Sequence, residues 1–141
     1  MKIIYQTGLV LLLIASDVTA QAQNKNTPGS NSPGKKSNMQ VVLIDRFVVP
    51  AGAKAEFLER ANINRDFIKH LPGFVEDNAY EEPGETESRI VTVAVWATEE
   101  AFQKARVAVV EEYKRQNFDV AELVSRLHIR MERGIYKRLE R

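Results

Sequence analysis

The sequence predicts an α+β fold in which a four-stranded antiparallel sheet carries helices on one face. Two observations lead to this prediction. Short stretches rich in β-branched residues alternate with segments whose apolar residues recur at helical spacing, in the order β-α-β-β-α-α-β. The candidate strands are also apolar on both faces, so each face needs a covering layer. Helices on one side of a single domain of about 100 residues cover only one of these faces.

The first strand and helix follow from their apolar spacing. Residues 39–49 are rich in β-branched residues and stop at Pro50-Ala51-Gly52, which is typical of a strand followed by a turn. The next segment, 53–71, carries an apolar helical stripe that Pro72-Gly73 ends. The stripe is formed by Phe57, Leu58, Ala61, Ile68 and Leu71.

A hairpin is expected in the middle of the domain. Residues 74–80 alternate as a second strand, with Phe74 and Tyr80 on the same face. Pro83-Gly84 lies in a turn that leads to the third strand, 88–96. The short connection predicts that these two strands pair with each other.

Two helices and a strand close the chain. Thr98 stands at an N-cap position with acidic residues behind it, which predicts a helix that runs to about Asn117. Asp119 has the same capping role for a short helix over 120–127. Residues 128–139 alternate as the final strand.

The first 38 residues differ in composition from the rest. Lys2 precedes an apolar run from Ile3 to Ala15, and small residues end at Ala20-Gln21-Ala22. This pattern predicts a secretory signal peptide over 1–22, cleaved after Ala22. The run is shorter than the roughly 20 apolar residues of a membrane-spanning helix, so we expect no membrane association after cleavage. A short membrane anchor or a buried N-terminal helix is the alternative.

Residues 23–38 contain no aliphatic or aromatic side chain and are rich in Asn, Ser, Pro and Gly, which predicts a disordered tether. The folded domain is therefore expected at 39–141, in an exported protein that is periplasmic or secreted. The chain has no cysteine, which excludes thiolate catalysis and Cys-type zinc sites. A net charge of +1 gives no reason to expect a nucleic-acid partner.

Two segments carry a resemblance to a known family. Pro72-Gly73-Phe74 follows the first helix, and the stretch VWATEEAF, 95–102, joins the third strand to the next helix. With the order of elements, they resemble the antibiotic biosynthesis monooxygenase (ABM) domain family over about 100 residues. The resemblance implies a ferredoxin-like fold in which two sheets pair as a homodimeric α+β barrel. The second sheet would then cover the strand faces that the helices leave open.

Trp96 is the chain's single tryptophan. It is either a packing residue or the wall of a pocket between sheet and helices. In haem-degrading relatives, a Trp at this position presses on the porphyrin, a His ten residues later binds iron, and an Asn on the first strand assists. Here those two positions are Arg106 and Asp45, which argues against haem degradation.

Several polar residues are further candidates. His70 could be a general base or an exposed residue that complements the helix dipole. Asp45 could be a base or a pocket residue, or it could form an ion pair across the dimer, because it and Arg46 point to opposite faces. Substrate binding is assigned to Tyr80, Asn62, Arg65 and Arg106. Neither histidine has a second ligand at metal-like spacing, so no metal is expected.

The resemblance implies an exported, cofactor-independent monooxygenase that oxidises a quinol or polycyclic phenol. In such relatives the deprotonated substrate reacts with oxygen directly, and the protein supplies a dry cavity, a base and polar groups. The catalytic candidates are then Asp45, His70 and Trp96. The alternative is a dimeric binding protein without turnover, for a hydrophobic small molecule or haem.

Overall fold

The computed structural model describes residues 39–139. The predicted signal peptide, 1–22, and tether, 23–38, lie outside the described residues, as do the last two residues of the predicted domain. The elements are β1 (Val41–Pro50), a 3-10 turn (Ala51–Ala53), α1 (Lys54–Ile68), β2 (Phe74–Glu82), β3 (Glu87–Trp96), α2 (Glu99–Arg115), α3 (Val120–Arg126) and β4 (Arg130–Lys137). This is the predicted order of elements.

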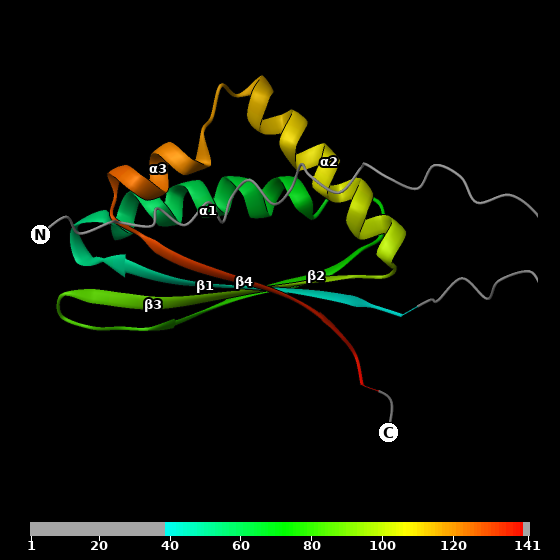
Figure 1. Ribbon diagram of the computed structural model, residues 1–141, viewed down its shortest axis with the longest axis horizontal. Helices are drawn as coiled ribbons and strands as arrows, with labels where there is room; N and C mark the ends of the chain where they lie inside the picture. Colours follow the sequence, from blue (N-terminus) through cyan, green and yellow to red (C-terminus); the bar gives the residue numbers. More distant parts are fainter. Residues whose placement is uncertain (1–38, 140–141) are drawn as a thin grey trace, which may run out of the picture.

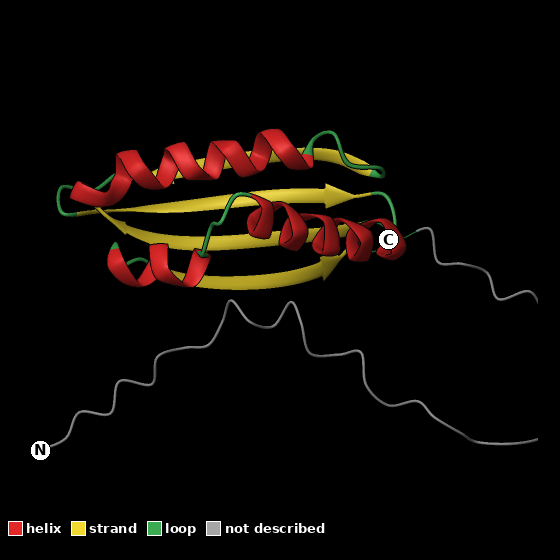
Figure 2. Cartoon of the chain, turned by 90° about the horizontal axis from the view of Figure 1, so that it is seen from above, coloured by secondary structure: helices red, strands yellow, loops and turns green. Residues whose placement is uncertain are grey.

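The four strands form one antiparallel sheet in the order β2-β3-β1-β4. All three helices cover the same face of this sheet, and the opposite face carries no helix (Figure 1). Seen from above, α1 lies along one side of the sheet, and α2 and α3 follow one another along the other side (Figure 2). The α+β, ferredoxin-like fold is therefore confirmed.

Both predicted helix caps are present. The Thr98 side chain accepts a hydrogen bond from the backbone N–H of Ala101 at 3.1 Å, and Asp119 accepts one from Glu122 at 3.1 Å. Each cap satisfies a backbone donor that the first turn of a helix leaves unpaired. These short polar residues therefore fix where α2 and α3 begin.

The two segments that carry the family resemblance touch each other. Gly73 has a φ of 80° and lies so close to Ala101 that no side chain fits between them, which requires glycine. Its carbonyl accepts a hydrogen bond from the Ala97 N–H at 2.8 Å. Beside it, the rings of Phe74 and Trp96 pack edge to face at 5.7 Å. The loop before β2 and the junction between β3 and α2 therefore form one packed unit.

A β-bulge in β2 changes which of its side chains lie on each face of the sheet. The register with β3 shifts between Phe74 and Glu76, so one extra residue enters the strand. Phe74 packs with Trp96 on the helix side, whereas Tyr80 pairs with Val91 on the open face and is 61% exposed. The prediction that Phe74 and Tyr80 share a face was wrong, because a bulge inverts the alternation beyond it.

The space between helices and sheet contains two separate apolar clusters. The first surrounds Trp96 and the second surrounds Phe57, at opposite ends of β1. Val41 belongs to the first and Val49 to the second, and both are fully buried. Midway between them on the same face of β1 lies Asp45, which is 7% exposed. The interior is therefore apolar at both ends and charged in the middle.

The open face of the sheet has an apolar centre. It is made of β-branched residues from the two central strands, namely Val42, Ile44, Val48, Val91, Val93 and Val95.

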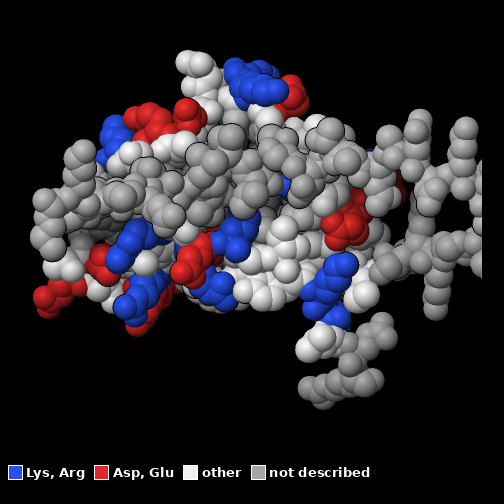
Figure 3. Space-filling view, viewed as in Figure 1, with Lys and Arg blue, Asp and Glu red and all other residues white. Residues whose placement is uncertain are grey.

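On the side of the molecule drawn in Figure 3, acidic and basic side chains are interspersed. None of the helices within residues 39–139 has the length and apolar character needed to cross a membrane.

Candidate functional site

A cavity of about 180 Å³ lies between the two apolar clusters. All four strands contribute to its floor, β2 through Asp77, and the three helices form its walls. Its apolar lining includes Leu43, Phe57, Trp96, Val109 and Met131. Charged and polar side chains project into the same space, so the cavity combines apolar walls with a few polar groups, as ligand sites do.

The floor of the cavity holds a bidentate ion pair between β1 and β4. Arg133 donates from Nε and Nη2 to the two carboxylate oxygens of Asp45, both at 2.7 Å. Burial tends to lower the pKa of Arg133, but the hydrogen bonds and charge of Asp45 outweigh this effect and raise the pKa. The ion pair expected for Asp45 thus forms within one chain, because residue 133 pairs with residue 45 across the sheet. This corrects the expectation of a pair across a dimer.

Tyr113 on α2 forms part of the wall. Its hydroxyl donates a hydrogen bond to Oδ1 of Asn64 on α1 at 3.1 Å. Burial raises the pKa of Tyr113 above its ordinary value of 10.0, so the phenol keeps its proton at neutral pH. The contact joins α1 to α2 and leaves a neutral hydroxyl on the cavity.

Arg60 on α1 is held between side chains of the α2–α3 region. Its guanidinium carbon lies 3.6 Å from the ring centre of Phe118 and 5.3 Å from that of Tyr113. Nη1 donates to Gln116 at 2.6 Å. The Nε and Nη2 atoms are shielded from solvent, and neither has a hydrogen-bond partner among residues 39–139. Arg60 is therefore a lining residue of the cavity whose Nε–Nη2 edge is covered by neighbouring protein atoms.

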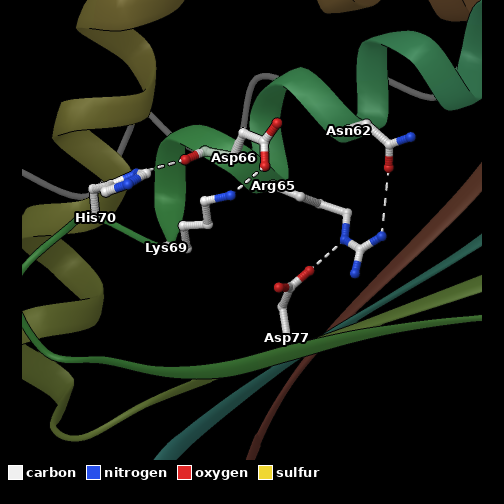
Figure 4. Close-up of polar contacts among 6 residues, drawn as sticks. All are labelled: Asn62, Arg65, Asp66, Lys69, His70 and Asp77. Atoms are coloured by element: carbon white, nitrogen blue, oxygen red, sulfur yellow. Dashed lines mark hydrogen bonds and ion pairs between the residues drawn. The ribbon is translucent and has the colours of Figure 1, made fainter.

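Two predicted residues, Arg65 and Arg106, also line the cavity. Arg65 reaches down from α1 to Asp77 on β2 and forms an ion pair with it (Figure 4). Arg106 on α2 donates to Gln103 at 2.9 Å and lies over the ring of Phe102. Because β2 and β3 separate Arg65 on α1 from Arg106 on α2 in the sequence, the fold is what brings these two arginines to one space.

The structure places three predicted site residues away from the cavity. His70 is exposed at the end of α1, where its Nδ1 atom lies 2.8 Å from the Asp66 carbonyl oxygen (Figure 4). Asn62 is exposed and contacts Arg65 at 3.5 Å. Tyr80 lies on the open face of the sheet, in a shallow groove that also contains Arg46. By contrast, Trp96, Asp45, Arg65 and Arg106 all line the cavity.

The cavity has an excess of positive charge. Its lining contains four arginines and two aspartates, namely Arg60, Arg65, Arg106, Arg133, Asp45 and Asp77. Such a lining favours negative charge on a bound molecule, most strongly where water is excluded. Within the described part of the chain, no group of three or more His, Asp or Glu side chains is arranged to hold a metal ion.

Sequence reasoning did not identify Arg60, Tyr113 or Arg133 as site residues. Arg133 had a signal, because it interrupts the apolar face of the last strand formed by Ile129, Met131 and Ile135. A charged residue at an inward position of a strand requires a partner, and Asp45 was the charged residue on the inward face of β1. No pattern in the sequence marks Arg60 as a site residue, because a charged residue on a helix is ordinarily exposed to solvent. It follows two positions of α1 that are exposed or half-buried.

The family model of antibiotic biosynthesis monooxygenase matches residues 40–113. Among solved structures, the chain is similar to SnoaB from Streptomyces nogalater, a cofactor-independent oxygenase, with 25% identity and a TM-score of 0.55 over 73% of this chain and 96% of SnoaB. It also resembles a Methanosarcina mazei protein at 16% identity and a TM-score of 0.57, over 74% of this chain and 97% of that one.

A third similar structure is the monooxygenase of ActVA-Orf6 from Streptomyces coelicolor, solved with Nanaomycin D. Its identity is 18% and its TM-score 0.51, over 74% of this chain and 91% of that one. At these identities the second and third structures show a shared fold and nothing more. None of the curated proteins matches the sequence.

Proposed function

Because the chain belongs to the antibiotic biosynthesis monooxygenase family, we propose that it is an exported, cofactor-independent oxygenase acting on a quinol or polycyclic phenol. The observation that carries the proposal is the cavity, which joins apolar walls to a charged middle. Apolar walls hold an aromatic ring, and the charged groups act on its oxygen substituents.

The size of the cavity favours the smaller members of this substrate class. Its volume of about 180 Å³ lies close to that of an apolar cavity of about 150 Å³ that binds benzene. Clefts that enclose drug-sized molecules measure about 300–1,000 Å³. We therefore expect a substrate with a single ring or two fused rings, which lies against Trp96 at one end of the cavity.

The charged middle would assist loss of the phenolic proton. Arginine side chains around the ring favour the phenolate, which is electron-rich enough to react with dioxygen. Asp45 is the carboxylate proposed to receive the proton. Although both of its oxygens accept from Arg133, each keeps a lone pair. His70 is not proposed as the base, because it lies outside the cavity.

The reaction balances without a cofactor. A ring carbon that bears hydrogen loses it and gains one oxygen atom as a carbonyl, the phenol becomes a second carbonyl, and the other oxygen atom leaves as water. The four electrons that reduce dioxygen all come from the substrate. The protein is then required only to exclude water, orient the ring and stabilise the anion.

Oxygen consumption tests this function. The purified protein is supplied with phenols and quinols of one, two and three rings, and the products are identified by mass spectrometry after labelling with ¹⁸O₂. We expect Asp45→Asn to slow the reaction about 100-fold, as loss of a general base does, and His70→Ala to leave it unchanged. If the protein takes up no oxygen above background with any ring size, the oxygenase proposal is wrong.

We also propose that two chains pair through the open face of the sheet. That face has a centre of six β-branched residues and no covering helix in the described chain. Burying it against a second copy would give an interface of the class found in obligate homodimers. Sedimentation equilibrium at micromolar concentration tests this, with Ile44→Asp as the variant expected to be monomeric. A monomeric wild type would contradict it.

Export is proposed from the N-terminal sequence alone. The apolar run and the Ala20-Gln21-Ala22 site predict removal of the first 22 residues. Sequencing the N-terminus of the protein recovered from the periplasm or medium should give Gln23. Retention of Met1 in the cell interior would contradict the proposal.

A further inference from the structure

Polar groups reach the cavity both from the sheet and from the helices. On the sheet, Asp45 and Arg133 form the ion pair of the floor. On the helix side, the tips of Tyr113 on α2 and Asn64 on α1 meet in a hydrogen bond of 3.1 Å, and both residues line the cavity. Burial has the largest influence on the pKa of Tyr113, and the charges of Arg133 and Asp45 also contribute. The Tyr113 hydroxyl therefore lies near the ion pair, on the other side of the cavity.

The direction of the hydrogen bond between Tyr113 and Asn64 decides what the hydroxyl can offer a ligand. A phenolic hydroxyl has one proton to donate and lone pairs that accept. Tyr113 donates its proton to Oδ1 of Asn64, and burial raises the pKa of Tyr113, so the proton stays on the oxygen at neutral pH. Among residues 39–139 the hydroxyl has no second hydrogen bond. Its oxygen is therefore left as an acceptor, and a ligand that binds it has to bring the donor.

A ring with hydroxyl groups at opposite ends fits these two positions. Helices α1 and α2 face the sheet across the cavity, so a ring held between them can direct its 1- and 4-substituents toward opposite layers (Figure 1). One hydroxyl would then donate to Asp45 on the floor, and the other would donate to Tyr113. A simple phenol has a donor for only one of these acceptors, and a quinone has carbonyl oxygens in place of both donors.

We propose that Tyr113, positioned by Asn64, selects a 1,4-quinol over a simple phenol and over the oxidised quinone by accepting a hydrogen bond from the second hydroxyl of the ligand. This inference deepens the proposed function and rests on it for the place of the first hydroxyl at Asp45. A ligand hydroxyl that is buried without a partner lowers affinity, whereas one that meets an acceptor does not. Because oxidation removes the donor, the same contact favours release of the oxidised form.

Calorimetric titration in the absence of oxygen tests this selection, because binding is then measured without turnover. The probes are hydroquinone and 4-fluorophenol, which have nearly the same shape and differ in whether the second substituent can donate. We expect the wild type to bind hydroquinone about fivefold more tightly, the effect of one neutral hydrogen bond. A change in the fluorescence of Trp96, the only tryptophan in the chain, reports that the probe lies in the cavity. Equal affinity for the two probes, or binding of neither, would overturn the inference.

Two variants and one control make the result specific. Tyr113→Phe removes the acceptor and keeps the ring, so 4-fluorophenol should then bind at least as tightly as hydroquinone. Asn64→Leu releases the proton of Tyr113, which can then point at the ligand, and should reduce the preference for hydroquinone. Tyr80→Phe removes a hydroxyl on the open face of the sheet, at a residue that is 61% exposed, and should behave as wild type.

The ratio of the two affinities distinguishes selection from a structural role. A residue that only supports the fold would change the affinity for both probes together and leave their ratio as in the wild type. An unchanged ratio in Tyr113→Phe would therefore overturn the inference. If Tyr113→Phe does not fold, the ratio in Asn64→Leu decides in the same way.

Oxygen uptake separates this inference from the proposed function. If hydroquinone binds through Tyr113 but no phenol or quinol is oxidised, the selection by Tyr113 stands and the oxygenase proposal is wrong. If phenols are oxidised but a second hydroxyl gives no advantage in binding, the oxygenase proposal stands and the selection by Tyr113 is wrong.

Discussion

The ends and the middle of the interior are built on different physical principles. At the ends, Trp96 and Phe57 anchor apolar clusters that are closed to solvent. In the middle, Asp45 and Arg133 form an ion pair, and Arg60 has two donors without partners among residues 39–139. Burial of apolar surface drives folding, whereas buried charge opposes it unless it is paired. The ends therefore stabilise the fold, and the middle is retained at the expense of stability, which is expected of a functional site.

Removing Trp96 should produce the largest loss of stability. Its side chain is 3% exposed and packs on Phe74, so Trp96→Ala leaves a cavity at the apolar end. We expect a loss of about 3–5 kcal/mol, measured by urea unfolding at a fixed protein concentration. Val107→Ala, at a position 64% exposed on α2, should change the free energy of unfolding by less than about 0.5 kcal/mol. A loss below about 1 kcal/mol for Trp96→Ala would show that Trp96 is not part of the stabilising core.

Breaking the ion pair in the middle should have the next largest effect. Arg133→Met leaves the buried carboxylate of Asp45 without its partner, at a loss of about 3 kcal/mol, the lower end of the usual range because Arg133 is partly exposed. The double variant Asp45→Leu/Arg133→Met should recover most of this loss, since an apolar pair replaces the ions. A double variant as unstable as Arg133→Met would show that the Asp45 charge is not what destabilises the single variant.

The hydroxyl of Tyr113 should contribute less. Tyr113→Phe removes the hydrogen bond to Asn64 but keeps the ring against Phe118, at a loss of about 1 kcal/mol at neutral pH. Because burial raises the pKa of Tyr113, the folded state holds this proton more tightly than the unfolded state. The stability that the protonated group contributes is therefore complete below pH 10.0 and is lost as the pH rises through the folded pKa.

The variant without the hydroxyl should not have this alkaline loss. Urea unfolding of wild type and Tyr113→Phe, at neutral pH and above pH 10.0, should show the two free energies converging as the pH rises. Tyr80→Phe serves as the control, because Tyr80 is 61% exposed and should run parallel to wild type. A constant difference between wild type and Tyr113→Phe across this range would contradict the expected role of burial.

The elements at the ends of the interior were predictable from sequence because local signals define them. Thr98 and Asp119 fix two helix starts through their own side chains, and Pro72-Gly73 ends the first helix. These signals act within a few residues, so reading the chain in short windows finds them. The order of elements, and with it the sheet, follows.

The middle was less predictable because its contacts join distant parts of the chain. The partner of Asp45 lies 88 residues away, and only the β1–β4 register reveals it. Tyr80 was placed on the wrong face because the extra residue near Val75 leaves no mark in the local sequence. The orientation of Arg60 depends on the packing of Phe118, which lies in the loop before α3. Site geometry therefore required the tertiary structure.

Replacing Arg60 should have the smallest effect on stability. Arg60→Met loses the contact with the aromatic rings and one hydrogen bond, together about 1–3 kcal/mol. It also removes a shielded cation with unsatisfied donors, which returns a similar amount. We expect a net change within about 1 kcal/mol by urea unfolding. A loss comparable to that of Arg133→Met would mean that the contacts of Arg60 outweigh the cost of its covered donors, and the contrast between the apolar ends and the charged middle would fail.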